Sequence, residues 1–526
     1  DLKMGSNYPA KYPNFGRRSQ YIASINGVDS IVKNSDDRIQ KYSGYSQWDV
    51  SQKVLFQQNK KVTHLLNLQY SNSTNVPRYD RLQDLRNGSL RFAEWYYGPQ
   101  TRTLAAYELS VQSTGIFNDI KAIVSHQFIK ESRHQREYRR YDRLDNRIEK
   151  LNVVAYTIDA RKLWQAHEVT IGTDGQLNKA QSTAFRKNTN TGSVSPLDTR
   201  YPNGSNNMNY FGLYAQHLFK FGNGQWVLND GVRLQTTQLR STIADNSFFN
   251  FPFVEISTNN VALTGNVGLI YMPSADLRFA LGLSSGFRAP NIDDLSRIFE
   301  SNSASRQIII PNPGIKPEYT YNADLGFTKN FGAARIEAGT FYTLFRNAIA
   351  LAPFQLNGED SIPYNGSNAK VFANQNINKA QLYGFYGNLS IEFAKRFKFF
   401  GSINYTYGKL QPATSPKVPL DHIPPIYGRV SLNYTMQKFW AEGYVMYNGW
   451  KRTGSYNPSG EDNLQYATAD GTPAWTTLNF KTGFSVTKNL QAQAGVENIL
   501  DRNYRPFASG FSGGGRNFIL SLRSTF

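Results

Sequence analysis

Asp421 and His422 stand side by side in the segment PLDHIPP, and this adjacency is the first feature of the chain that could do chemistry. An aspartate that orients a histidine is part of the arrangement by which hydrolases activate a serine. A hydrolase built on this pair would need both side chains near the rim of its fold. Nothing else in the sequence supports such a site, so we expect no enzyme.

Three further patterns argue against a built-in metal or nucleotide site. The run Gly460-Glu461-Asp462-Asn463 is acidic but lacks the ligand spacing of a calcium loop. The segment from Gly510 to Gly515 is rich in glycine but has no lysine, which a phosphate-binding loop requires. Because the chain has no cysteine, it offers neither a thiolate ligand nor a disulfide. We therefore predict no intrinsic cofactor.

Aromatic residues in or beside long polar segments are the candidates for ligand contact. Such side chains stack on flat ligands, and they also anchor a protein at a membrane surface. We favour anchoring and keep stacking as the alternative. The aromatic residues in question, which we expect to be exposed, are Trp95, Tyr96, Tyr97, Trp450, Tyr456 and Trp475. Four of them, Trp95, Tyr96, Tyr97 and Tyr456, are candidates for substrate binding together with Arg288.

The elements that must position these residues are strands. Apolar and polar residues alternate from Leu277 to Leu283, which predicts a strand with one apolar face. Pro290 then opens a loop, since proline has no amide hydrogen to donate to a sheet. Pro311 and Pro313 close that loop before the next strand begins at Tyr319. The unit is therefore a strand, a long loop and a strand.

About 20 candidate strands follow one another along the chain, each near the length that crosses a bilayer at a tilt. Short connections such as QNKK, FGNG and KNFGA alternate with long ones. Transmembrane barrels show this asymmetry, with short periplasmic turns and long extracellular loops. At about 24 residues per strand and connection, the sequence predicts an all-β, antiparallel barrel of about 22 strands that occupies residues 1–526 as one domain.

Composition agrees with a barrel. Aromatic residues make up 14% of the chain, while the mean hydropathy is only −0.51. No apolar run approaches the roughly 20 residues that a membrane helix needs. Composition alone fits a large secreted β-protein equally well, and the loop asymmetry decides for the barrel.

The net charge of +19 does not indicate a nucleic-acid partner, because the basic residues are scattered. One run, Lys130 to Lys150, is rich in arginine, and we expect it to form a loop that contains His134. Such a loop is a solvated surface, or on a barrel it meets lipopolysaccharide phosphates or an anionic cargo.

The last strand carries a further signal. Phe518, Leu520, Leu522 and Phe526 share a face, and the chain ends on Phe526. A terminal phenylalanine after an amphipathic strand resembles the signal by which outer-membrane proteins reach the barrel assembly machinery. We therefore assign Phe526 as that assembly signal.

Several motifs resemble those of TonB-dependent outer-membrane transporters. The family motif residues are Phe287, Arg288, Ala289 and Pro290 in GFRAPNIDDL, with Asn312 and Pro313 in NPGIKPE. The ending from Gly495 to Phe526 is similar to the C-terminal signature of the same family. The segments PRYDRL and AEWYYGPQTR resemble members from Bacteroidota.

The resemblance implies energised import of a scarce nutrient across the outer membrane of a Gram-negative bacterium. In that family a plug fills the barrel, and an inner-membrane TonB complex pulls on a short box ahead of the plug. We favour a plug and box that precede Asp1 and are not represented here, and a barrel without a plug is the alternative. The partners implied are membrane lipid and lipopolysaccharide, the TonB complex, the assembly machinery and a surface lipoprotein.

The cargo implied is an iron chelate such as a siderophore or haem, or a cobalamin-like compound. In haem receptors of the family, a histidine between the two boxes is an expected iron ligand, but residues 291–311 contain none. Each of the six histidines also has an ordinary structural explanation: His64, His126, His167 and His217 lie in predicted strands, His134 in the arginine-rich run and His422 before a strand.

Arg288 has two interpretations. We favour a pairing with Asp293 or Asp294 that orders the loop, and contact with cargo is the alternative. For the whole barrel, the alternative to energised import is a passive porin or a surface-binding barrel.

Overall fold

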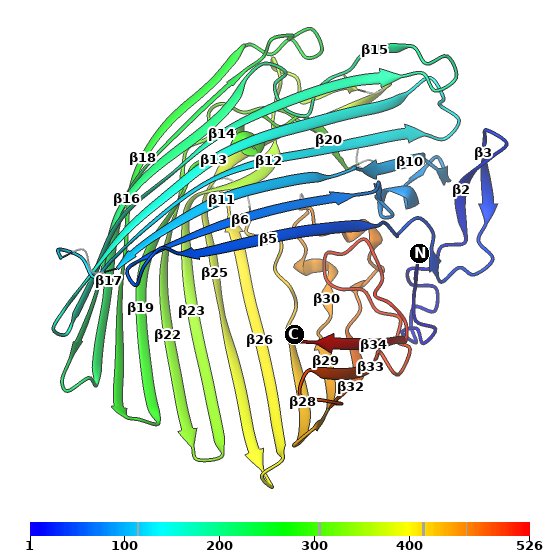
Figure 1. Ribbon diagram of the computed structural model, residues 1–526. Coiled ribbons are helices and arrows are strands. Elements are labelled where there is room, and N and C mark those ends of the chain that lie inside the picture. The colour runs from blue at the N-terminus through cyan, green and yellow to red at the C-terminus, as the bar shows by residue number, and fades with distance from the viewer. Residues whose placement is uncertain (113–114, 303–306, 365, 413–415, 459, 526) are drawn as a thin grey trace.

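The computed structural model describes residues 1–112, 115–302, 307–364, 366–412, 416–458 and 460–525. Twenty-six strands form one sheet with the strand order of a closed barrel, and the pairs of long neighbouring strands are antiparallel throughout (Figure 1). Nineteen of these strands have eight or more residues. The expected 22 lies between the two counts, so the exact number of membrane-crossing strands stays a prediction.

The long strands, in chain order, are β5 (Gln47–Gln57), β6 (Val62–Ser73), β11 (Thr101–Gln112), β12 (Asp119–Glu137), β13 (Leu144–Trp164), β14 (His167–Lys187), β16 (Asn206–Phe221), β17 (Trp226–Thr242), β18 (Glu255–Ser274), β19 (Leu277–Arg288), β22 (Glu318–Phe331), β23 (Ala334–Pro353), β25 (Ser367–Phe393), β26 (Phe397–Gln411), β28 (Tyr427–Met436), β29 (Phe439–Asn448), β32 (Trp475–Ser485), β33 (Leu490–Glu497) and β34 (Asn517–Ser524). The short strands in the same sheet are β7 (Val76–Pro77), β10 (Phe92–Tyr97), β15 (Val194–Pro196), β20 (Phe299–Asn302), β21 (Gln307–Ile309), β24 (Ser361–Tyr364) and β27 (Val418–Pro419).

The two ends of the barrel differ as the sequence predicts. Short turns join β13 to β14 and β22 to β23 at one end, where Gln165 and Gly332 adopt positive φ. Long connections join the strands at the other end, where the only α-helix of the described residues, α1 (Ile292–Ser296), is found. Hence the short turns mark the periplasmic side and the long loops the extracellular side.

Apolar side chains on the outer face of the wall are uncovered. Leu281 and Leu283 of β19 are 44% and 52% exposed, and Leu263 of β18 is 69% exposed. In water such a surface would be unfavourable, but in a bilayer it contacts acyl chains. The alternation predicted for β19 is therefore confirmed as an outward apolar face.

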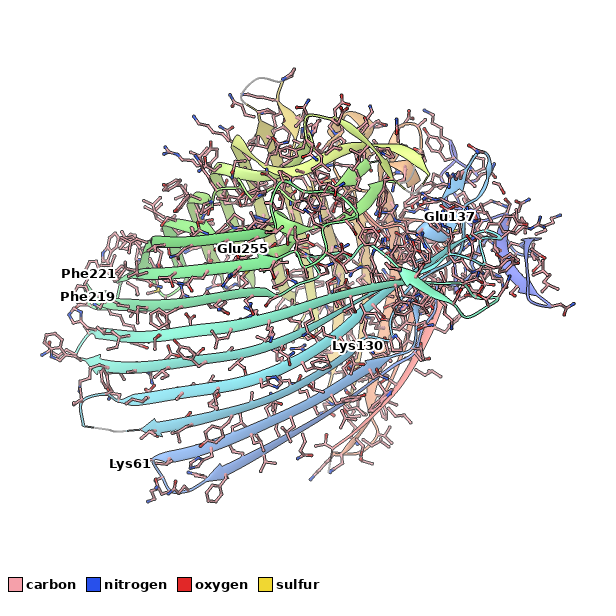
Figure 2. The ribbon with its side chains drawn as sticks, turned by 90° about the horizontal axis from the view of Figure 1, so that it is seen from above. Lys61, Lys130, Glu137, Phe219, Phe221 and Glu255 are labelled. Atoms are coloured by element: carbon pink, nitrogen blue, oxygen red, sulfur yellow. The ribbon has the colours of Figure 1, made fainter. Side chains whose placement is uncertain are left out.

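An aromatic row follows the turn end of β14, β16, β17 and β18, where Figure 2 labels Phe219 and Phe221. The ring of His167 stacks on Phe219 at 4.3 Å, and the ring of Trp226 stacks on Tyr271 at 4.1 Å. Rings at this level suit the polar interface of a membrane, as expected for a barrel girdle.

The arginine-rich segment is not a loop, and this prediction was wrong. β12 continues to Glu137 and β13 begins at Leu144, so only a short turn lies between them, and His134 is a strand residue. Figure 2 labels Lys130 and Glu137 on the same strand. The strands extend beyond the membrane, where both faces are polar and the apolar alternation that marks a strand is lost.

The first 46 residues lie outside the barrel wall, at its loop end. The strand expected near residues 18–28 is instead a separate hairpin of β2 (Gln20–Ile25) and β3 (Val28–Lys33). The segment also includes β1 (Leu2–Lys3), which pairs with β4 (Ile39–Gln40). The other small elements at the loop end are β8 (Leu85–Arg86), β9 (Ser89–Leu90), β30 (Lys451–Arg452), β31 (Gly471–Thr472) and the 3₁₀ turns η1 (Arg81–Gln83), η2 (Thr453–Ser455) and η3 (Leu464–Tyr466).

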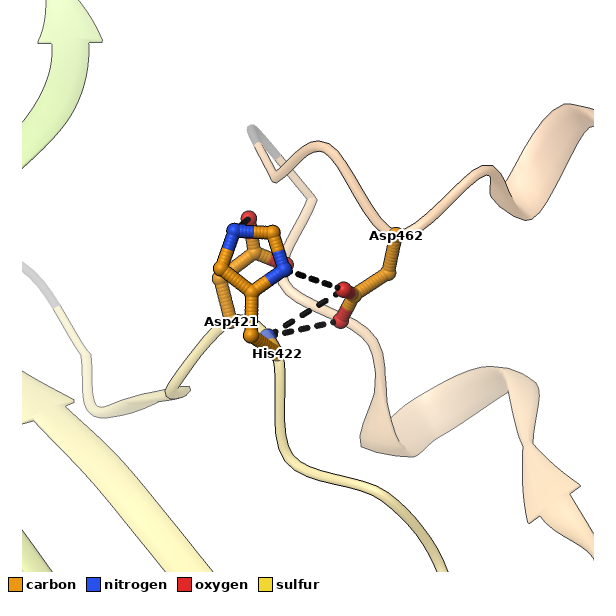
Figure 3. A group of neighbouring side chains, drawn as sticks. All are labelled: Asp421, His422 and Asp462. Carbon is orange, nitrogen blue, oxygen red and sulfur yellow. Dashed lines mark hydrogen bonds and ion pairs between the residues drawn. The ribbon is translucent and has the colours of Figure 1, made fainter. Parts of the chain in front are cut away.

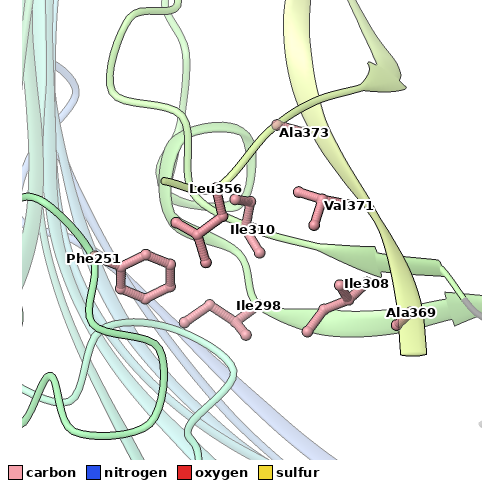
Figure 4. Close-up of a cluster of buried hydrophobic side chains, with 8 residues drawn as sticks. All are labelled: Phe251, Ile298, Ile308, Ile310, Leu356, Ala369, Val371 and Ala373. Atoms are coloured by element: carbon pink, nitrogen blue, oxygen red, sulfur yellow. The ribbon is translucent and has the colours of Figure 1, made fainter. Parts of the chain in front are cut away.

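Three extracellular loops share a buried apolar core, shown in Figure 4. Its members are Phe251, Ile298, Ile308, Ile310, Leu356, Ala369, Val371 and Ala373. They come from the β17–β18 connection, the β19–β22 connection and the region of β23 to β25. Burial of these side chains packs the loops into one folded cap, so the loops do not fold independently of one another.

No helix among the described residues is long and apolar enough to cross a membrane.

Candidate functional site

The first motif box forms the start of the long loop between β19 and β22. β19 ends at Arg288, Pro290 is buried, and the chain enters α1 through a reciprocal cap. The Asn291 carboxamide oxygen accepts from the Asp294 amide at 2.9 Å, and the Asp294 carboxylate accepts from the Asn291 amide at 3.1 Å. This capping box satisfies two amides that the helix leaves unpaired.

Arg288 pairs with Asp294. Its Nη2 donates to Asp294 Oδ1 at 2.9 Å, and the Asp294 side chain is only 8% exposed. Asp293, the other predicted partner, instead accepts from Arg297 at 2.9 Å and from the Tyr201 hydroxyl at 2.8 Å. The expectation of an ordering ion pair is thus confirmed, with Asp294 as the partner. Burial raises the pKa of Asp294, although the nearby guanidinium of Arg288 opposes that shift.

The second motif box is tied to the first. The Asn312 amide donates to the Leu295 carbonyl at 3.1 Å, and the Asn312 carboxamide donates to the Asn374 carbonyl at 2.8 Å. In the same box Pro313 is exposed. The two boxes therefore hold the loop against β25, which explains their pairing in the sequence.

The remaining motif residues are placed on the wall. Phe287 packs on Tyr319 across the β19–β22 pair, with ring centroids 5.4 Å apart, and Ala289 is half-buried. The cargo alternative for Arg288 gains no support from these contacts, because its guanidinium is already engaged.

Trp95, Tyr96 and Tyr97 belong to β10 and are half-buried, so the prediction that they are exposed was wrong. The Tyr96 ring stacks on His134 at 4.7 Å, and Tyr97 accepts a short hydrogen bond from the Arg78 guanidinium. The Trp95 ring meets Tyr97 edge-on at 5.3 Å. These three rings form a rim cluster with partners of their own, and their role in substrate binding stays a prediction.

Tyr456 is not exposed, and this part of the prediction was wrong. The residue is 4% exposed, and its hydroxyl lies 2.8 Å from the Thr472 hydroxyl. The ring lies under the Lys451 ammonium at 5.5 Å. Trp450 and Trp475 are half-buried rather than exposed, and Trp475 packs on Tyr504 at 4.6 Å. Phe526 lies outside the described residues, so its assignment stays a prediction.

Asp421 and His422 meet Asp462 in a cluster that the sequence did not predict (Figure 3). His422 Nδ1 lies 3.0 Å from Asp462 Oδ1, and the His422 amide donates to the same carboxylate at 3.1 Å. His422 Nε2 lies 3.8 Å from Asp421 Oδ2. Forty residues separate the two segments, and no spacing rule links them.

The charges of this cluster depend on one another. The hydrogen bond with Asp462 raises the pKa of His422 to about 9. Burial, and then the neighbouring Asp462, raise the pKa of Asp421 to about 6. Burial opposes ionisation of Asp462 too, but its hydrogen bond with His422 keeps its pKa below the usual range.

A salt bridge connects the motif loop after β19 with the cluster around His422. Arg297, directly after α1, lies 3.8 Å from Glu461, the neighbour of Asp462.

Of the other histidines, His64, His126, His167 and His217 lie in strands, as predicted.

Residues 3–499 match the family described as TonB dependent receptor-like, beta-barrel. The chain therefore belongs to the TonB-dependent receptor β-barrel family, whose members are receptors and transporters of the Gram-negative outer membrane. It is 25% identical over 300 residues to the probable hemoglobin and hemoglobin-haptoglobin-binding protein 4 of Haemophilus influenzae, covering 50% of this chain and 29% of that protein. It is 23% identical over 247 residues to the iron-regulated outer membrane virulence protein of Vibrio cholerae, covering 47% and 36%.

Solved structures share the fold. The copper transporter OprC superposes with a TM-score of 0.73 at 15% identity, over 92% of this chain and 74% of that one. The Serratia marcescens receptor HasR, solved with its hemophore HasA and heme, superposes with a TM-score of 0.66 at 15% identity, over 92% and 72%. The chain spans only about a third of the length of the curated relatives that it matches.

Proposed function

We propose that this barrel is the membrane-spanning part of a receptor that imports an iron chelate or haem across the outer membrane. The observation that carries the proposal is the loop cap, in which Arg288–Asp294, the Asn312 bonds and the shared apolar core hold three loops in one shape over the barrel. A fixed surface of this kind suits selective capture of a ligand, because little ordering free energy is lost on binding.

The names of the relatives support this class of cargo. They bind hemoglobin or hemoglobin–haptoglobin, or are regulated by iron. Residues 291–311 of this chain contain no histidine, so haem would need ligands elsewhere. A siderophore or a cobalamin-like compound needs no such histidine, and both remain within the proposal.

The partners proposed are those of an energised receptor. An N-terminal plug of the same polypeptide would connect the barrel to the inner-membrane TonB complex, and a surface lipoprotein would assist capture. The membrane contacts are acyl chains on the outer face and lipopolysaccharide phosphates at the basic loop end.

Growth of a deletion strain tests the proposal. With haem, hemoglobin, ferric siderophores or cobalamin as the limiting supply, we expect the strain to lose growth on one of them, and the full-length gene to restore it. An uncoupler of the proton gradient should abolish the restored uptake. Unchanged growth on every supply would overturn the proposal.

The passive porin is the competing function. It predicts steady ion conductance when the full-length protein is inserted in a planar bilayer, whereas a plugged receptor stays closed. Open channels of constant conductance would favour the porin.

A further inference from the structure

The cluster of Asp421, His422 and Asp462 is the one group of three or more metal-ligating side chains that converge within the part of the chain the structure describes. Each residue offers one ligand atom, and these atoms all lie within 4.8 Å of one another. Two connections supply them: Asp421 and His422 precede β28, and Asp462 lies between β30 and β31. The fold thus brings distant ligands to one point.

A second observation concerns the Asp421 carboxylate itself. Its Oδ2 accepts from the Glu461 amide at 2.7 Å, but its Oδ1 is buried and has no hydrogen-bond partner among the described residues. A buried acceptor without a donor is costly, and a cation at the site would satisfy it. Gly460 lets the two loops approach this closely, since a Cβ there would lie too near Asp421 Oδ1 and clash with it.

The donor set selects the ion. One imidazole and two carboxylates suit a borderline divalent ion such as Zn²⁺, whereas Ca²⁺ prefers six or more oxygen ligands. Two ligands about 2.0 Å from a tetrahedral ion lie roughly 3.3 Å apart, and His422 Nδ1 is 3.0 Å from Asp462 Oδ1. The His422 side chain is 68% exposed, so an ion can reach it from solvent.

We propose that Asp421, His422 and Asp462 bind a divalent transition-metal ion of the Zn²⁺ class, which clamps the loop before β28 to the loop between β30 and β31. The ion takes the place of the proton between His422 Nδ1 and Asp462, and that proton leaves to solvent. The fourth ligand is water. The inference concerns a clamp within the loops and does not depend on which cargo the barrel carries.

Zinc titration of the purified, detergent-folded chain tests the site. The protein is produced without a histidine tag, treated with a chelator, and titrated with Zn²⁺ in competition with a chromogenic chelator. We expect one tight ion per chain, and at least tenfold weaker binding for His422→Gln and for Asp462→Asn. Mn²⁺ should bind more weakly and Ca²⁺ weakest.

His134→Gln is the matched control, because it removes an imidazole at the same end of the barrel and should leave zinc binding unchanged. His422→Gln is the primary variant, since its side chain is largely exposed and folding is checked by heat-modifiable gel mobility. If the wild type binds no zinc at micromolar concentration, or if the His422→Gln variant binds it equally, the cluster is a protonated ion pair only and the proposal is overturned.

Discussion

Two carboxylates at the loop end of this barrel are buried beside a cation, and the cations differ. Asp294 faces Arg288, whose guanidinium keeps its charge at every physiological pH. Asp462 faces His422, which keeps its charge only while the imidazole is protonated. The first arrangement fixes its loop permanently, whereas the second can be changed by pH or by an ion. The loop end therefore contains one permanent ion pair, Arg288–Asp294, and one conditional ion pair, His422–Asp462.

Removal of the permanent cation should have the largest effect. Arg288→Ala leaves the buried Asp294 carboxylate without its partner, and we expect local opening of residues 289–317 to become easier by about 2–3 kcal/mol, reduced from the buried-pair range because Arg288 is partly exposed. Hydrogen exchange of peptides from this loop measures the change. Arg278→Ala, on the same face of β19 at its other end, is the control and should leave the loop peptides unchanged.

Asn312→Ala should have the next effect. The variant loses the carboxamide bond to the Asn374 carbonyl and the bond from the Gly314 amide, so we expect about 1–2 kcal/mol of local destabilisation. Protease cleavage within residues 307–317 reports it. Cleavage as slow as in the wild type would show that the Arg288–Asp294 pair alone fixes the loop.

The stability of the conditional ion pair, His422–Asp462, should depend on pH. The folded pKa of His422, about 9, lies above its ordinary value of 6.5, so the stabilisation is complete below pH 6.5 and is lost as pH rises through 9. Asp421, Asp462, Glu461 and Lys451 supply the surrounding charges. We expect about 1 kcal/mol after solvent screening.

Hydrogen exchange of residues 449–474 between pH 6.5 and 9.5, with a chelator present and rates corrected for intrinsic pH dependence, checks this prediction. Residues 289–317 serve as the internal reference, since the partner of Asp294 in that loop is an arginine and not a histidine. An equal response of both loops would remove the distinction between them.

Pro313→Ala should have the smallest effect. Pro313 belongs to the second motif box but is exposed, so its loss changes mainly the freedom of the open loop, by about 0.5 kcal/mol. Comparison of loop stability in this variant and in Asn312→Ala shows whether a motif residue stabilises the loop merely because it belongs to the motif. A loss of stability as large as that of Asn312→Ala would contradict the small contribution assigned to Pro313.

Strand alternation predicted the barrel because a lipid-facing wall has the strict period of two that a sequence displays, as in Leu281 and Leu283. The alternation of short and long connections predicted which end of the barrel is periplasmic and which is extracellular. The pairing of Arg288 was narrowed to two aspartates, and only the helix cap at Asn291 selects Asp294 over Asp293.

The misses have physical reasons. The strands around His134 rise above the membrane, where neither face is apolar, so the periodic signal ends before the strand does. Tyr456 was expected to be exposed because its neighbours are polar, but the loop folds over it. Asp421 and Asp462 meet only because two separate loops pack together, and no local pattern records that contact.

The contacts of the first residues with the last connection set an order of folding. The Ser6 amide donates to Asp501 at 3.0 Å, and the Gln40 carboxamide donates to the Ser512 carbonyl at 3.0 Å. These partners are 495 and 472 positions apart, so the entropic cost of closing that loop falls on a late event. The neighbouring hairpins can form as soon as their own strands are available, but this junction cannot form before residues 501–512 are available. During assembly, residues 1–46 therefore lack these contacts until a late stage. In that period they are the segment most accessible to a chaperone or a protease.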